Sequence, residues 1–199
     1  MSALLPVVIV SGLGRCGTSL VMQMLSAGGL PCVGLYPGFE DERAGAERVD
    51  AAWLARMDGH AVKILDPQRS RPALPAHRYT LFLTRDHCQQ AASQVKFCEM
   101  LLGIRTGRAG RRKLQSFLGS DEKAARIALK LAISPHREMR FEDIIRHPRQ
   151  SAQRMAADLS AWWSLDAGAM TACVRRRSTD CLPGLLEAQL VAEARDAFR

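Results

Sequence analysis

The sequence predicts an α/β fold of three layers, in which a central parallel sheet is flanked by helices. Short apolar segments rich in β-branched and aromatic residues alternate with longer segments of helical periodicity. The first apolar segment runs through glycines directly into a helix. With 199 residues, 47% of them hydrophobic, the chain can bury one sizeable core, so we expect residues 1–199 to form a single domain.

The amino-terminal part is predicted to be a strand, a loop and a helix. Residues 7–11 are apolar, as in a strand buried on both faces, and residues 12–17 contain three glycines and form the loop. A helix is expected over residues 18–27, because a glycine pair follows its apolar pattern. Residues 34–45 are rich in glycine and acidic side chains and should form an exposed loop before a helix over 46–57.

Two further strands are expected at residues 61–65 and 79–84, both short and apolar. Residues 85–102 should form a helix. Residues 104–113 interrupt the apolar pattern with glycines and basic side chains, which indicates a mobile loop.

The last predicted elements are a helix over residues 121–133, a strand over 138–141 and a helix over 151–163. The alternation of strands and helices favours right-handed crossovers between parallel strands. No internal repeat interrupts this order.

The clearest chemical signal is the string SGLGRCGTSL at residues 11–20. A strand that passes through glycines into a helix presents backbone N–H groups that bind phosphate, and the hydroxyls of Thr18 and Ser19 can donate to the same oxygens. A nucleotide triphosphatase needs lysine after the last glycine, where this chain has Thr18, and the nearest cation is Arg15. The string therefore predicts a P-loop-type anion site and argues against ordinary ATP hydrolysis.

The six cysteines form no CxxC pair and no zinc-site spacing, so we expect reduced, mostly structural thiols. Cys16 differs because it lies in the glycine-rich loop. There a helix N-terminus and Arg15 would lower the pKa of its thiol, although a role in filling the loop is favoured.

Residues 15–19 (RCGTS) resemble the 5'-phosphosulfate-binding loop of the sulfotransferases that use PAPS (3'-phosphoadenosine 5'-phosphosulfate), and they differ from its pattern at Cys16. The arginine in the loop is most similar to the tyrosylprotein and bacterial branches of that family. The resemblance implies that the donor PAPS, or its product PAP, is held by Gly14, Arg15, Cys16, Gly17, Thr18 and Ser19.

Two later segments are similar to the same family. Arg85 and Ser93 follow a predicted strand at the spacing of its 3'-phosphate-binding element, and residues 139–148 (MRFEDIIRHP) resemble the segment that closes around the nucleotide. Phe141 replaces the commoner tyrosine there, which leaves packing against the adenine. The acidic pair Glu142 and Asp143 is expected to be structural, as a helix cap or a partner for loop arginines.

The resemblance implies transfer of a sulfuryl group from PAPS to a hydroxyl or amine, without a metal. Arg15 would stabilise the leaving phosphate, and Lys63 resembles a lysine near this site in relatives. The base is open between Glu40, which resembles an acidic position after the loop helix, and His60, which precedes the strand of Lys63. Glu40 is slightly favoured.

Two basic clusters, residues 105–113 and residues 175–177, could grip the 3'-phosphate or be solvated surface, and the first could instead face an acidic acceptor or act as a lid. The net charge of +8 fits an anionic ligand but also fits nonspecific attraction to nucleic acid or membrane. Aromatic residues are missing from the first cluster, so specific RNA binding is not expected.

The alternatives to a sulfotransferase are a P-loop nucleotide or small-molecule kinase and a non-catalytic PAPS- or nucleotide-binding protein. We expect a small-molecule, glycan or lipid acceptor. The sequence has neither a signal peptide nor an apolar run of membrane-spanning length, so a cytoplasmic protein is expected. The acceptor and the oligomeric state stay open.

Overall fold

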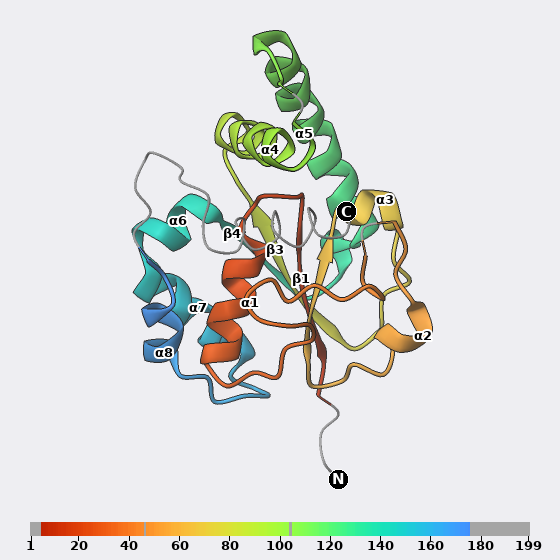
Figure 1. Ribbon diagram of the computed structural model, residues 1–199. Coiled ribbons are helices and arrows are strands. Elements are labelled where there is room, and N and C mark those ends of the chain that lie inside the picture. The colour runs from red at the N-terminus through yellow and green to blue at the C-terminus, as the bar shows by residue number, and fades with distance from the viewer. Residues whose placement is uncertain (1–4, 46, 104, 176–199) are drawn as a thin grey trace.

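Four parallel strands form the central sheet of the computed structural model, which describes residues 5–45, 47–103 and 105–175 (Figure 1). The strands are β1 (Val7–Gly12), β2 (Ala61–Leu65), β3 (Arg78–Thr84) and β4 (His136–Arg140). Their order is β2-β1-β3-β4, and every neighbouring pair is parallel. The predicted parallel sheet is confirmed, and β1 lies inside it with a partner on each side.

The strand register aligns the carboxyl ends of three strands. Gly12, the last residue of β1, stands opposite Leu65 of β2 and Leu83 of β3. The segments that follow these strands therefore leave the sheet at the same edge, where ligands bind in open parallel sheets.

The helices differ widely in length. The longer ones are α1 (Thr18–Ala27), α4 (His87–Leu102), α5 (Arg108–Ala128) and α7 (Pro148–Leu159). The shorter ones are α2 (Ala51–Leu54), α3 (Pro67–Ser70), α6 (Phe141–Arg146), α8 (Ala167–Ala172) and the 3-10 helix η1 (Leu131–Ile133). Within the described residues, no helix is both long enough and apolar enough to cross a bilayer.

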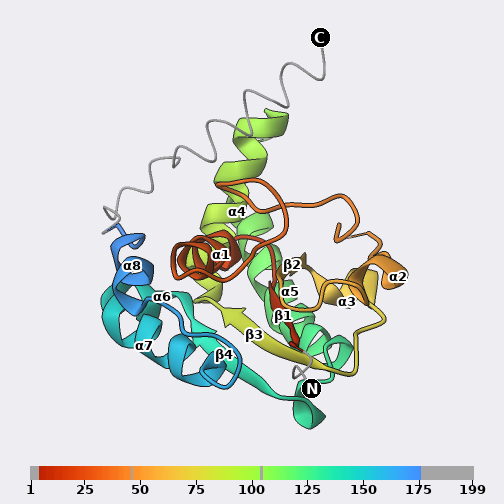
Figure 2. The ribbon, with the colours of Figure 1, turned by 90° about the horizontal axis from the view of Figure 1, so that it is seen from below.

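Alternate side chains of β1 enter two different cores. Val8 and Val10 pack with α1, α7 and α8, whereas Val7 and Ile9 pack with α2 and α5. Figures 1 and 2 show α7 and α8 beside α1, with α2 and α3 across the sheet. This two-sided burial explains why the strand contains no alternation of apolar and polar residues.

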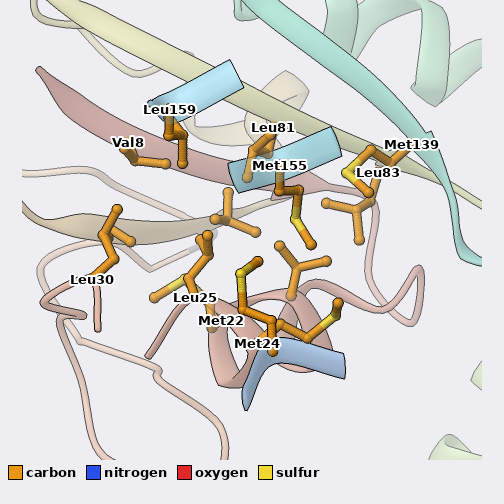
Figure 3. Packing of buried hydrophobic residues seen from close by; sticks show 14 of the residues in the cluster. Val8, Met22, Met24, Leu25, Leu30, Leu81, Leu83, Met139, Met155 and Leu159 are labelled. Atoms are coloured by element: carbon orange, nitrogen blue, oxygen red, sulfur yellow. The ribbon is translucent and has the colours of Figure 1, made fainter. Parts of the chain in front are cut away.

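The core beneath α1 is rich in methionine (Figure 3). Met22 and Met24 of α1 face Met155 of α7, and Leu81 of β3 joins the same cluster from the sheet. Unbranched thioether side chains fill irregular space between two helices and a sheet well. This packing fixes α1 against the sheet and so fixes the start of the helix.

The start of α5 contradicts the prediction of a mobile loop over residues 104–113. The helix begins at Arg108 and includes Gly110. Leu114 and Leu118, four residues apart, face the second core, and the helix packs against α4. This packing outweighs the cost of about 1 kcal/mol for glycine within a helix. The predicted helix over residues 46–57 was also too long, since only α2 forms there.

Removal of the Leu81 side chain should destabilise the domain, because this residue is fully buried at the centre of β3. We expect Leu81→Ala to lower the free energy of unfolding by about 3 kcal/mol, measured by urea denaturation. Ile133→Ala, at an exposed position, is the control and should change it by less than about 0.5 kcal/mol. Equal effects of the two variants would contradict this account of the core.

Candidate functional site

The glycine-rich loop begins where β1 ends and closes a tight turn. The N–H of Cys16 donates to the Leu13 carbonyl at 3.2 Å, and Arg15 has a φ of +69°. Two glycines are required by close contacts. A Cβ on Gly12 would lie 2.5 Å from the Leu83 carbonyl oxygen, and one on Gly17 would lie 2.4 Å from the Phe141 ring.

Gly17 is also the N-cap residue of α1, with a φ of +102°. Because glycine has no side chain, it cannot accept a hydrogen bond from the first N–H groups of the helix. Those groups, together with the amides of the loop, form an arrangement suited to an anion. The predicted strand, loop and helix are therefore confirmed, while the anion nest stays a prediction.

The structure brings Arg15, Arg85 and Ser93 together. The Nε of Arg15 donates to the Oγ of Ser93 at 3.3 Å, and the Nη1 of Arg85 donates to the Arg15 carbonyl at 3.0 Å. The Arg15 guanidinium also lies over the ring of Phe97, 5.0 Å from its centroid. Two motifs that are 70 or more residues apart in the sequence thus form one cationic group at the carboxyl edge of the sheet.

Lys63, on β2, contacts both helix α1 and the segment that carries Glu40. Its ammonium is almost fully buried and donates to Ser19 Oγ at 3.2 Å, to the Gly38 carbonyl at 2.5 Å and to Glu40 Oε1 at 3.0 Å. Burial lowers the pKa of Lys63, while Glu40 opposes the shift. The Glu40 side chain is 58% exposed, so its carboxylate lies between the buried lysine and solvent.

His60 is not brought to this group. It precedes β2, and its Nδ1 lies 2.9 Å from the Asp58 carbonyl. Parallel pairing places the start of β2 beside the start of β1, so His60 lies five residues, roughly 16 Å along the strand, before the residue opposite Gly12. The strand direction therefore separates His60 from Lys63, although the two are near in sequence.

The expectation that the pKa of the Cys16 thiol is lowered is wrong. The thiol is buried, and this burial raises its pKa to about 12 despite a backbone hydrogen bond at Thr18 and the charge of Arg85, which both act in the opposite direction. Cys16 fills the loop, as favoured from the sequence. The other described cysteines are also free thiols, and Cys181 lies outside the described residues.

The sequence suggested that Phe141 ends a strand. In the structure Phe141 instead begins helix α6. Its ring is 7% exposed, packs on Gly17 and lies under the Arg85 guanidinium, whose centre is 4.6 Å from the ring centroid. The neighbouring Glu142 accepts a hydrogen bond from the N–H of Asp86 at 3.0 Å. These contacts support the loop and the start of α4.

Two residues that sequence reasoning missed hold the loop from either side. Asp66 Oδ1 accepts the N–H of Gly14 at 3.2 Å, and Gln90 Nε2 donates to the Gly14 carbonyl at 2.8 Å. One signal could have indicated Asp66, because it directly follows a predicted strand, at the edge where the loop lies. Gln90 lies within a helix and carried no such signal.

The basic clusters are placed only in part. Arg105, Arg108, Arg111, Arg112 and Lys113 are all exposed, before α5 or in its first turns. Arg175 is described, whereas Arg176 and Arg177 lie outside the described residues. Neither cluster has a described contact with the glycine-rich loop.

Comparison with known proteins supports the fold. No family model and no curated protein matches the chain. Mouse sulfotransferase SULT7A1, solved in complex with PAP, aligns with a TM-score of 0.57 and 10% identity over 90% of this chain and 68% of its own. A sulfotransferase from Alicyclobacillus acidocaldarius aligns with a TM-score of 0.47 and 14% identity over 95% of this chain and 92% of its own. The chain therefore has the three-layer α/β fold seen in SULT7A1.

Alkylation of the native protein should distinguish Cys16 from an exposed cysteine. At pH 8 a thiol with a pKa of about 12 is ionised in only about one molecule in ten thousand, so Cys16 should stay unmodified by iodoacetamide. Exposed Cys88 is the internal control, and mass spectrometry of the peptides gives both rates. In urea both cysteines should react, whereas equal native rates would contradict the buried position of Cys16.

Proposed function

We propose that this chain is a sulfotransferase that transfers the sulfuryl group of PAPS to a hydroxyl or amine acceptor. The observation that carries the proposal is the contact of Arg15 with Ser93 and Arg85 at the glycine-rich loop. A ligand with phosphate groups at two separated positions would use such a pair of neighbouring cations. The fold shared with SULT7A1, which was solved with PAP, supports the same ligand.

The chemistry of the described residues fits this donor. Loop amides, the Arg15 guanidinium and the hydroxyls of α1 suit the 5'-phosphosulfate, while Arg85 and Ser93 suit the 3'-phosphate. The nearby carboxylates are engaged with protein groups, since Asp66 accepts from Gly14 and Glu40 pairs with Lys63. The charge of Glu40 is therefore balanced by Lys63, whereas Asp66 keeps a negative charge at the loop, which the charges of Arg15 and Arg85 oppose.

PAPS, when bound, supplies an electrophilic sulfur and a phosphate leaving group. Arg15 and the loop amides would stabilise the negative charge that develops on the leaving oxygen, an effect worth about 3 kcal/mol for one well-placed donor. Lys63 lies beside Ser19 at the start of α1, from where its ammonium could reach the transferring group. These roles depend on positions fixed before the ligand arrives.

Glu40 is our candidate for the base, and His60 is set aside because of its place at the opposite edge of the sheet. Glu40 would accept the proton of the acceptor hydroxyl as the acceptor oxygen bonds to sulfur. The electron pair of the broken sulfur–oxygen bond leaves on the phosphate of PAP. The ion pair with Lys63 holds the Glu40 carboxylate next to the helix that would bind the donor.

The acceptor would enter beside Glu40. A surface cavity of about 540 Å³ is lined by Gly34, Leu35, Glu40, Asp41, Glu42 and Arg43. Leu35 and the adjacent Tyr36 are highly exposed, which suits an acceptor with an apolar part. A small molecule, a glycan end or a lipid headgroup in the cytoplasm would meet this description.

Titration with PAP tests the donor site. By isothermal calorimetry we expect micromolar binding, weakened at least about tenfold in Arg15→Ala and in Arg85→Ala, because each loses charge-assisted hydrogen bonds. Arg154→Ala, which removes an exposed arginine on α7, is the matched control and should bind like the wild type.

The same titration separates the alternatives. Binding of ATP with Mg²⁺ but not of PAP would replace the proposal by the kinase function. Binding of PAP without turnover of PAPS in a panel of phenols, alcohols, sugars and amines would indicate a non-catalytic binding protein.

Once an acceptor in the panel is found, Glu40→Gln should lower the kcat of sulfuryl transfer by about a hundredfold or more, because the base is lost. The rate is measured as the formation of PAP from PAPS. The Kd of Glu40→Gln for PAP should stay within about threefold of the wild type, since Glu40 is not assigned to the donor. Glu42→Gln, an exposed neighbour that lines the same cavity, is the control. An equal loss of kcat in both variants would remove Glu40 from the mechanism.

A further inference from the structure

The turn at Leu13–Cys16 holds its arginine in an unfavourable conformation. The Cys16 N–H closes the turn onto the Leu13 carbonyl, and Arg15 at the third position has a φ of +69°. Turns with a positive φ at that position prefer glycine there. The glycine of this turn is Gly14, one position too early to relieve the strain.

A second conformation of the turn would be easier for Arg15. Rotation of the peptide between Gly14 and Arg15 by half a turn converts this kind of turn into the commonest type, with a negative φ at the third position. A side chain other than glycine gains about 1 to 2 kcal/mol by leaving the left-handed region. The observed state therefore needs contacts that outweigh this preference.

Gln90 provides such a contact at the peptide in question. Its Nε2 donates to the carbonyl of Gly14, at 2.8 Å, and that carbonyl belongs to the Gly14–Arg15 peptide. The Gln90 side chain, on α4, is 1% exposed. After rotation of the peptide, the carbonyl would point away and leave a buried amide donor without this acceptor, which is costly.

Asp66 secures the preceding peptide. Its Oδ1 accepts the Gly14 N–H, and its own N–H donates to the Gly12 carbonyl at 3.1 Å. Asp66 is the N-cap residue of α3, yet its side chain makes no capping hydrogen bond to that helix and instead reaches the loop. A strong N-cap residue that leaves its own helix uncapped indicates a requirement at the loop.

The held peptide determines where Arg15 points. In the observed state the Arg15 carbonyl accepts from Arg85, and the Arg15 Nε reaches Ser93. Rotation of the peptide would change φ at Arg15 and so redirect the side chain. We propose that Gln90, supported by Asp66, is a positioning residue that selects the turn state in which Arg15 faces the donor site. The expected effect on PAP binding rests on the proposed function.

The test compares Gln90→Leu with the wild type, alone and combined with Arg15→Ala. Gln90→Leu should weaken PAP binding by about tenfold, the effect of one lost hydrogen bond and a relaxed turn. In the Arg15→Ala background, the same change should cause no further loss, because Gln90 acts through Arg15. Crystal structures should show φ of Arg15 changing from positive to negative in Gln90→Leu.

Gln90→Glu gives a pH-dependent version of the test. Its carboxylate cannot donate to the Gly14 carbonyl, whereas the protonated acid can. The Kd for PAP, expressed relative to the wild type at each pH, should therefore recover as the pH falls. The carboxylate would also repel an anion near the loop, so a recovery of equal size in the Arg15→Ala background would count against the proposal.

Two results would overturn the proposal. One is wild-type affinity in Gln90→Leu with an unchanged φ at Arg15, and the other is an equal loss of affinity with and without Arg15. If the wild type itself binds no PAP, the proposed function fails, and the φ of Arg15 in Gln90→Leu still decides whether Gln90 holds the turn.

Discussion

The position of β1 is the constraint on which the site depends. This strand is paired on both edges and buried on both faces, so its end cannot move without breaking two ladders. Gly12 then lies too close to the Leu83 carbonyl for any side chain, and Gly17 lies as close to the Phe141 ring. The loop is confined at both ends by packed structure, and its amides take up their positions as a consequence of the fold.

The cations at this edge depend on the same confinement. Lys63 lies on the edge strand β2 opposite Val10, where desolvation disfavours its charge, and three acceptors around its ammonium offset that cost. Arg15 is held by Ser93 and by the ring of Phe97, and Arg85 by the carbonyl of Arg15. Each charge is oriented before a ligand binds, which reduces the reorganisation that an anion would require.

The strands and the first helix could be predicted because the residues that determine them are neighbours in the sequence. Helix α1 and strand β2 begin and end where the glycines and the apolar pattern indicated. The start of α5 was missed because glycine and arginine spacing suggested a loop, whereas packing of Leu114 and Leu118 decided the structure. Gln90 was missed because its partner Gly14 lies 76 residues away and no local pattern records such a contact. Asp66 lies 52 residues from Gly14 and could have been indicated only by its place after a predicted strand.

His60 illustrates a different limit. It is three residues from Lys63, and a short sequence distance suggests a short spatial one. Along an extended strand, however, each residue advances about 3.3 Å, so His60 lies roughly 10 Å from Lys63 along the strand, on the side away from the carboxyl ends of the strands. The direction of β2, predicted to be parallel to β1 and confirmed in the structure, strengthens the preference for Glu40 over His60 as the proposed base.

The fold agrees with that of SULT7A1 at only 10% identity, and the backbone character of the fold gives a reason. Loop amides, positive φ values and parallel pairing are properties of the backbone, and many sequences can satisfy them. In this chain, few side chains are added to that backbone at the proposed site: a cation in the loop, a cation after β3 and glycines where the chain approaches another segment. A sequence can therefore change widely while this backbone arrangement is retained.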